Sequence, residues 1–173
     1  KFGPIDTINY SIDTLDKNLY VKITGAPPHF LEKIILGLIQ ARSQGIKVSI
    51  NTVVVKNLND DKNNFERLLS FCSKYKISEW KLIEEMRLTN GTFSPESFYL
   101  EDYARKMGIK IDQMQNYKIN LRHKGVPITL YRCHCAAVWL TKKYIPESLF
   151  LDPAGRILTC MHKNKKINVL EDI

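Results

Sequence analysis

The chain has 173 residues, a formal net charge of +8, and a composition that is 44% hydrophobic and 25% charged. Such a chain can bury a core, and it has no signal-peptide pattern and no apolar run near the ~20 residues of a membrane span, so we expect a cytoplasmic globular protein without a membrane partner. Positive charge can indicate nucleic acid or an anionic substrate. The lysines are scattered as on solvated helix faces, and the one compact basic run is 162–166, so we do not expect a nucleic-acid partner.

The first part of the chain alternates between strand-like and helix-like patterns. A long polar loop through Gly25-Ala26-Pro27-Pro28 is expected between the first strand and the first helix, and that helix carries the broad apolar stripe of a helix that covers a sheet. The strand that follows is rich in Val and Ile on both faces, as buried parallel strands are. The expected elements are a strand over 6–13, a helix from 28 to Gly45, a strand over 47–55, a helix over 61–75 and a strand over 78–84.

The pattern changes after about residue 110. Before that point, Ser94-Pro95-Glu96 predicts a helix start, with Ser as the cap and Pro in the first turn. Beyond it, two pairs of short strands flank turn sequences, which predicts two hairpins. We therefore expect an α/β region over 1–110 and a hairpin-rich extension over 111–173. The expected hairpins are 116–122 with 126–132, around His123-Lys124-Gly125, and 147–151 with 156–160, around Asp152-Pro153-Ala154-Gly155.

Polar side chains lie at the ends of two predicted strands. Ser11 and Asp13 end the first strand, and Asn51 lies toward the end of the strand over 47–55. Because parallel α/β sheets and barrels bind ligands at the carboxyl ends of their strands, the two ends should share one site. The alternative is that Ser11 and Asn51 cap a helix or turn, and that Asp13 caps the following loop, for which these residue types are also suited.

Five short segments carry a family resemblance through their order and spacing. They are Ile8-Asn9-Tyr10-Ser11-Ile12-Asp13-Thr14-Leu15, Ile23-Thr24-Gly25, Gly45-Ile46-Lys47-Val48-Ser49-Ile50-Asn51-Thr52-Val53-Val54, Asn57-Leu58-Asn59-Asp60-Asp61 and Leu82-Ile83-Glu84-Glu85-Met86. Together they resemble the radical SAM (AdoMet radical) superfamily, and within it the GTP cyclase that opens molybdenum-cofactor biosynthesis. The resemblance implies a partial TIM-like (β/α) barrel of three or so parallel βα units, followed by the extension.

The resemblance also implies roles for individual positions. Ser11 and Asp13 match the place where the family binds the ribose and carboxylate of S-adenosyl-L-methionine (AdoMet), and Asn51 matches the contact from the next strand. Glu84 and Met86 match the segment that supports the adenine or the substrate. The substrate expected from the resemblance is a small molecule or a peptide.

One defining motif of the superfamily is missing from the chain. The catalytic cluster of radical SAM enzymes is held by a CxxxCxxC loop, and neither this spacing nor a glycine-rich GGE-type segment occurs here. The chain begins at Lys1 without an initiator Met. We therefore expect a carboxyl-terminal portion of a longer enzyme that is inactive alone, with no catalytic residue of its own. Its first strand would then have lost a neighbour and would self-associate through the open edge.

Three cysteines of the second region suggest a metal site. The resemblance implies that Cys133, Cys135 and Cys160 hold an auxiliary 4Fe-4S cluster, and a C-x-C pair suits metal ligation in a reducing compartment better than a disulfide. The alternatives are a zinc site completed by His134 or His162, or three unligated thiols. Cys72 lies on the apolar stripe of the helix over 61–75 and is expected in the core.

The tail departs from the GTP cyclase pattern. The family has CxxC followed by Asn-Arg and an arginine-rich strand, whereas this chain has Cys133-His134-Cys135 followed by Ala136-Ala137-Val138-Trp139. Residues 150–160 also resemble the hairpin of the SPASM and twitch extensions of peptide-modifying radical enzymes. A peptide-modifying radical SAM enzyme and a non-enzymatic α/β protein with a structural zinc therefore remain as alternatives.

Overall fold

The computed structural model describes residues 5–85, 88–89, 92–93, 99–111, 118–132, 150–151, 157–158 and 166–167. The chain divides into two compact units, Lys1–Arg132 and Cys133–Ile173, which are described separately below. None of the helices in the described ranges is long and apolar enough to cross a membrane.

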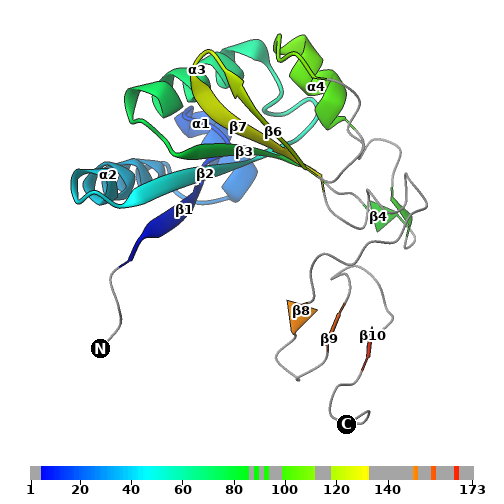
Figure 1. Ribbon diagram of the computed structural model, residues 1–173, viewed down its shortest axis with the longest axis horizontal. Coiled ribbons are helices and arrows are strands. Elements are labelled where there is room, and N and C mark those ends of the chain that lie inside the picture. Colours follow the sequence, from blue (N-terminus) through cyan, green and yellow to red (C-terminus); the bar gives the residue numbers. More distant parts are fainter. Residues whose placement is uncertain are drawn as a thin grey trace. The chain divides into compact units, whose positions relative to one another are not determined.

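The first unit is built on an open five-stranded sheet with the strand order β1-β2-β3-β7-β6 (Figure 1). Four neighbouring strands of the sheet run parallel, and β6 is antiparallel at one edge. This arrangement confirms the expected α/β fold with parallel units, as a sheet that does not close. The strands are β1 (Thr7–Ser11), β2 (Lys47–Val54), β3 (Glu79–Glu84), β6 (Lys118–His123) and β7 (Val126–Tyr131).

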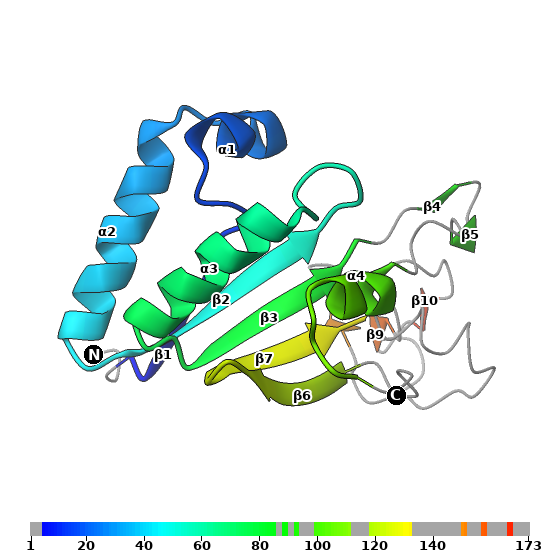
Figure 2. The same cartoon turned by 90° about the horizontal axis from the view of Figure 1, so that it is seen from above.

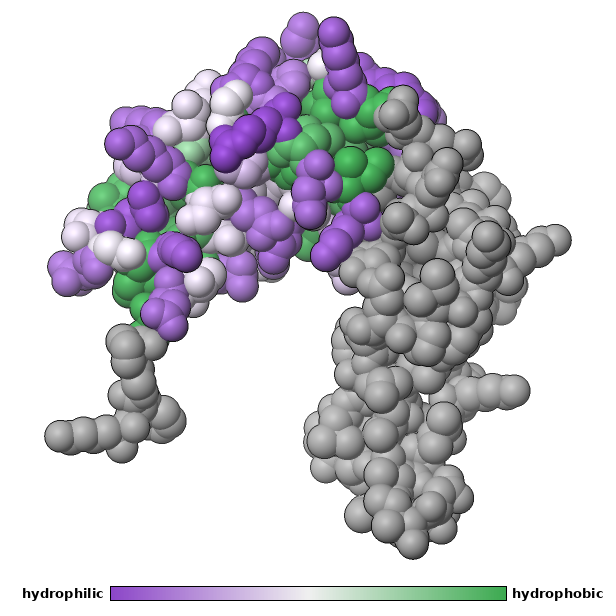
Figure 3. Space-filling view, in the orientation of Figure 1, coloured by the Kyte–Doolittle hydropathy of each residue, from purple (hydrophilic) through white to green (hydrophobic). Residues whose placement is uncertain are grey.

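Helices α2, α3 and α4 pack against one face of this sheet (Figures 1 and 2). Buried Leu31 and Leu38 of α2 and buried Phe65 and Leu69 of α3 join the residues of the strands in one hydrophobic core, because each helix turns an apolar stripe toward the sheet. The outer surface in the view of Figure 3 is largely hydrophilic, with hydrophobic areas between the polar side chains. The helices are α1 (Lys17–Thr24), α2 (His29–Ser43), α3 (Lys62–Lys74) and α4 (Leu100–Lys106).

Helix α1 lies where the sequence predicted a polar loop, so that part of the prediction was wrong. The Asp16 carboxylate accepts a hydrogen bond from the backbone N–H of Leu19, and Gly25 ends the helix with a φ of 69°. These are strong start and stop signals for a helix. The sequence interpretation missed these two signals because the segment between them buries only Tyr20 and therefore has little of the apolar periodicity of a covering helix.

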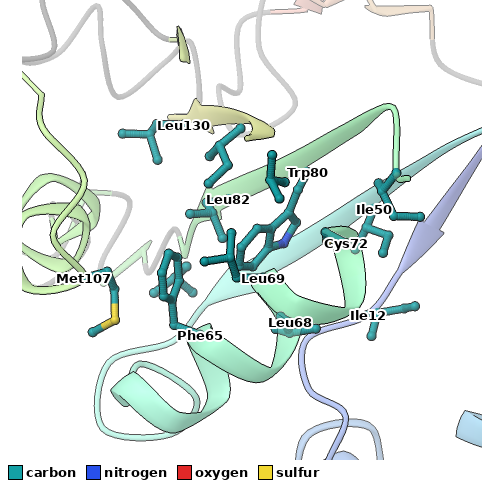
Figure 4. Packing of buried hydrophobic residues seen from close by; sticks show 14 of the residues in the cluster. Ile12, Ile50, Phe65, Leu68, Leu69, Cys72, Trp80, Leu82, Met107 and Leu130 are labelled. Carbon is teal, nitrogen blue, oxygen red and sulfur yellow. The ribbon is translucent and has the colours of Figure 1, made fainter. Parts of the chain in front are cut away.

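The core is centred on Trp80, which lies between α3 and the sheet with Phe65 and Leu69 close by (Figure 4). The rings of Phe65 and Trp80 stack with centroids 5.3 Å apart. Cys72 is 1% exposed, which confirms its expected place in the core. Burial of this continuous apolar cluster is the main stabilising contribution to the unit.

The hairpin expected around His123-Lys124-Gly125 is confirmed as β6 and β7, but it belongs to the main sheet. Strand β7 pairs in parallel with β3, and it buries Val126, Ile128 and Leu130 on the face that carries the helices. The first compact unit therefore runs to Arg132, past the boundary expected after residue 110. Sequence periodicity identified the two strands and gave no signal for their place in the strand order.

The second unit is described only in three short strands. Strands β8 (Phe150–Leu151), β9 (Ile157–Leu158) and β10 (Lys166–Ile167) form an antiparallel sheet, and the pairing of Phe150 with Leu158 confirms the second expected hairpin. In the sequence range of the first unit, two further short strands, β4 (Leu88–Thr89) and β5 (Thr92–Phe93), pair with each other. The helix start expected at Ser94-Pro95-Glu96 lies outside the described residues, and α4 begins at Leu100.

Candidate cofactor site

The sheet carries a polar row on the face opposite the helices. Side chains alternate along each strand, so Ile12, Ile50 and Trp80 point toward α3 (Figure 4) and their neighbours point to the other face. The strand register places Ser11 beside Asn51, and Asn51 beside Lys81. The polar residues of the first two strands, which were expected to share one site, therefore lie side by side.

Asn51 is the most unusual member of this row. Its side-chain oxygen Oδ1 is buried, and within the described part of the chain it has no hydrogen-bond partner. A buried acceptor without a partner costs free energy, and a donor from a bound molecule would remove that cost. Ser11, beside it in the register, has an exposed side chain. The cap alternative fails for the two nearest helices, because α1 is capped by Asp16 and α3 by Asp61.

Asp13 joins the ends of β1 and β2. Its carboxylate oxygen Oδ1 accepts a hydrogen bond of 2.7 Å from the backbone N–H of Val53. Burial raises the pKa of Asp13, and this hydrogen bond opposes that rise. The carboxylate thus caps the neighbouring strand. The sequence had suggested instead that it contacts AdoMet or caps the following loop. A contact between Asp13 and AdoMet stays a prediction.

Glu84 points to the helix side of the sheet, where its carboxylate already has partners. It pairs with the guanidinium of Arg132, and its Oε1 accepts the backbone N–H of Leu100 at the start of α4. Glu84 therefore links the ends of β3 and β7 to α4, and its expected contact with adenine or substrate is untested. Met86 and the three cysteines Cys133, Cys135 and Cys160 lie outside the described residues.

The sequence interpretation assigned no role to Asn59 and Asn64, which hold the strand ends together. Both side chains are buried, and both donate from Nδ2 to the backbone carbonyl of Asp13, over 3.2 and 3.1 Å. The available signal was a run of Asn and Asp directly after an apolar strand, because such side chains commonly bond to nearby backbone. That run was used only for the family resemblance.

Comparison with known proteins supports the relationship that the sequence suggested. A GTP 3′,8-cyclase from Campylobacter jejuni subsp. doylei is 31% identical over 186 residues, which cover 100% of this chain and 53% of that protein. A probable GTP 3′,8-cyclase from Methanosarcina mazei is 42% identical over 77 residues, covering 44% of this chain and 22% of that protein. The chain is a relative of the GTP 3′,8-cyclases. The radical SAM resemblance seen in the sequence is thereby confirmed, although no protein-family model matches the chain.

Solved structures match the fold of this chain. Streptococcus suis SuiB bound to S-adenosylmethionine matches with a TM-score of 0.55 and 18% identity, over 95% of this chain and 40% of that chain. SuiB in a second crystal structure matches with a TM-score of 0.56 and 17% identity, over 95% of this chain and 41% of that chain. The chain spans about half, or less, of the length of each protein named here.

Proposed function

We propose that the intact protein is an AdoMet-dependent radical enzyme, and that this chain contributes contacts to AdoMet from the ends of β1 and β2. The observation that carries the proposal is the buried Oδ1 of Asn51, which has no hydrogen-bond partner among the described residues and lies next to the exposed Ser11. The ribose hydroxyls and the amino group of AdoMet are donors of the kind this oxygen lacks. The relationship to the GTP 3′,8-cyclases supports the same reading.

The auxiliary metal site is a second part of the proposal. Cys133, Cys135 and Cys160 form a donor set of three thiols, and thiolates are the usual ligands of iron-sulfur clusters. A 4Fe-4S cluster bound there would supply an iron that can take a substrate atom. The chain itself would contribute position and the exclusion of water. A zinc site at the same thiols is the alternative that the donor set also allows.

The substrate follows from the relatives. We propose a purine nucleoside triphosphate, because the matched relatives are named as GTP cyclases. A peptide substrate is the second candidate, and the paired β8 and β9, which match the SPASM and twitch hairpin in sequence, favour it. The chain alone is expected not to cleave AdoMet, because its sequence lacks the CxxxCxxC spacing.

The AdoMet proposal is tested by titrating the 173-residue chain with AdoMet and following the side-chain amide of Asn51 by NMR. We expect weak, saturable binding that shifts this amide and is lost in Asn51→Ala. The matched control is Asn9→Ala. It removes the same side-chain amide from the same face of the sheet, at the position two residues before Ser11 on β1. No binding by the unmodified chain, or equal binding by Asn51→Ala, would contradict the proposal.

A further inference from the structure

The loop after β2 is the part of the family motif that the proposed function does not yet use. It contains Asn57-Leu58-Asn59-Asp60-Asp61, and two consecutive polar side chains of this run are buried, whereas Asn57 and Asp61 are exposed. Asn59 is 2% exposed and Asp60 is 8% exposed. Burial of consecutive polar residues in a loop is unusual and requires that each finds partners. Their partners show what the loop holds.

Asn59 contacts both strand ends with one side chain. Its Oδ1 accepts the backbone N–H of Val55 over 2.8 Å, and its Nδ2 donates to the carbonyls of Val53 (2.8 Å) and Asp13 (3.2 Å). One amide therefore closes the loop on β2 and also ties β2 to the residue that follows β1. A side chain with a donor and an acceptor on the same planar group is needed for this.

Asn64 gives the same carbonyl a second donor. Its Nδ2 lies 3.1 Å from the carbonyl of Asp13 and 3.0 Å from that of Asn59. Asp61 caps α3 by accepting the backbone N–H of Asn64, which fixes where the helix starts and so where this amide points. The Asp13 carbonyl is thus held from the loop and from the helix.

The rest of the loop is fixed to α4. Asp60 accepts the backbone N–H of Asn57 through Oδ1 and the Tyr99 hydroxyl, 2.8 Å away, through Oδ2. Lys106 also lies near this carboxylate, 3.9 Å from Oδ2. The loop that carries Asn59 is therefore anchored at its base and has little freedom to follow a strand end that moves.

We propose that Asn59 is a positioning residue for the cofactor site, an inference that rests on the proposed function. Asn59 donates to the carbonyl of Asp13, and the carboxylate of Asp13 accepts the N–H of Val53. Asp13 lies two residues after Ser11, the last residue of β1, and Val53 lies two residues after Asn51 on β2. The two bonds of Asn59 act together with the helix amide that holds the same carbonyl, and so contribute to the distance between the ends of β1 and β2. Loss of the Asn59 amide separates Ser11 from Asn51 and weakens the hold of the pair on one AdoMet molecule.

Asn59→Asp is the direct test because it is isosteric. It keeps an oxygen for the Val55 N–H and replaces the donor with an oxygen that faces the carbonyls of Asp13 and Val53. We expect the affinity for AdoMet to fall about tenfold, as when a partner behind a binding residue is removed. The matched control is Asn63→Asp, the same change at an exposed neighbouring position, which should leave affinity within about twofold.

A loss of affinity through general destabilisation is separated by a second variant. Ile77→Ala removes a buried side chain (3% exposed) just before β3, at the end of the sheet away from Ser11 and Asn51, and it lowers the free energy of unfolding without touching the loop. Affinities are compared at a temperature where every variant is folded. Asn59→Asp should lose affinity and speed hydrogen exchange at the Val53 N–H, and Ile77→Ala should do neither.

The outcomes distinguish the two proposals. Wild-type affinity in Asn59→Asp overturns the positioning role and leaves the AdoMet site standing. An equal loss of affinity in Ile77→Ala also overturns it. Absence of AdoMet binding in the unmodified chain overturns the site, and the positioning role with it.

Discussion

Arg132 and Glu84 form a buried ion pair in which two guanidinium nitrogens face one carboxylate, and the two residues are 3% and 4% exposed. Glu101 adds a further contact to Arg132, 3.4 Å away. Two charges held out of water in this way depend on each other, because either one alone is left uncompensated. The pair also joins the ends of β3 and β7 to α4.

Removal of one partner should therefore destabilise the fold strongly. We expect Arg132→Met to lower the free energy of unfolding by ~3–5 kcal/mol. The double variant Glu84→Gln, Arg132→Met should lose less than the sum of the two single variants, because no charge is left unpaired between the two sites. Urea denaturation of the four proteins in the cycle measures this coupling. Additive losses would show that the pair contributes no mutual stabilisation.

His123 should make stability depend on pH. Its Nε2 atom is buried and, in the described part of the chain, has no hydrogen-bond partner. Burial lowers the pKa of His123, the Lys124 charge lowers it further, and Glu66 opposes them. Since the folded-state pKa lies below the unfolded value of about 6.5, the unfolded chain takes up the proton first.

The contribution of His123 should thus be complete above about pH 6.5 and be lost as the pH falls below it. Thermal unfolding at a series of pH values should show a decline on the acid side that is smaller in His123→Phe. His29→Gln, at an exposed position, is the control and should keep the full decline. An unchanged pH profile in His123→Phe would rule out this origin.

Strand β1 lies at an edge of the sheet and is expected to recruit another chain. It pairs with β2 alone in the strand order, and Ile5, just before it, is 63% exposed. The N–H of Ile12 and the carbonyl of Asp6 bond to β2, so by alternation the even-numbered residues face β2 and the N–H of Asn9 faces outward. Unpaired edges of this kind favour association between chains.

Proline at the right position should block that association. Asn9→Pro removes an outward N–H and is expected to reduce self-association in sedimentation velocity experiments at high concentration. Tyr10→Pro is the informative counterpart, because it removes a bond to β2 and should lower stability instead. A monodisperse monomer for the unmodified chain at all concentrations would contradict the open edge.

Metal uptake should depend on three of the four cysteines. Anaerobic reconstitution with iron and sulfide is expected to give the visible absorption of thiolate-bound iron, reduced in Cys133→Ala, Cys135→Ala and Cys160→Ala. Cys72→Ala should take up metal normally, since that residue is buried and burial raises the pKa of its thiol to about 12. Stoichiometric zinc without iron would favour the structural-zinc alternative.

Much of the fold could be predicted because its signals are local. The apolar stripe of α2, the Val and Ile of β2 and the turn at Lys124-Gly125 each identify an element from its own residues. Helix α1 was missed because its evidence lies in Asp16 and Gly25 and not in apolar periodicity. The place of β7 beside β3 depends on pairing between residues far apart in sequence, for which a single sequence gives no signal.

The candidate site, like the fold, could be predicted only in part. That Ser11 and Asn51 meet follows from two parallel strands, and the register bears it out. That the Asp13 carboxylate binds Val53, and that Glu84 turns toward Arg132, depends on which face each side chain takes at the end of its strand. Those orientations are decided by the surrounding packing and not by residue type.

The two edges of the main sheet differ, and this difference limits how copies could assemble. At one edge, the antiparallel β6 exposes Lys118, Asn120 and Arg122, and charged edge strands resist pairing with another chain. The other edge is β1. A chain with one receptive edge can join a second copy edge to edge about a two-fold axis, and the contact then closes on itself. Strand pairing should therefore stop at two copies instead of growing into a fibre.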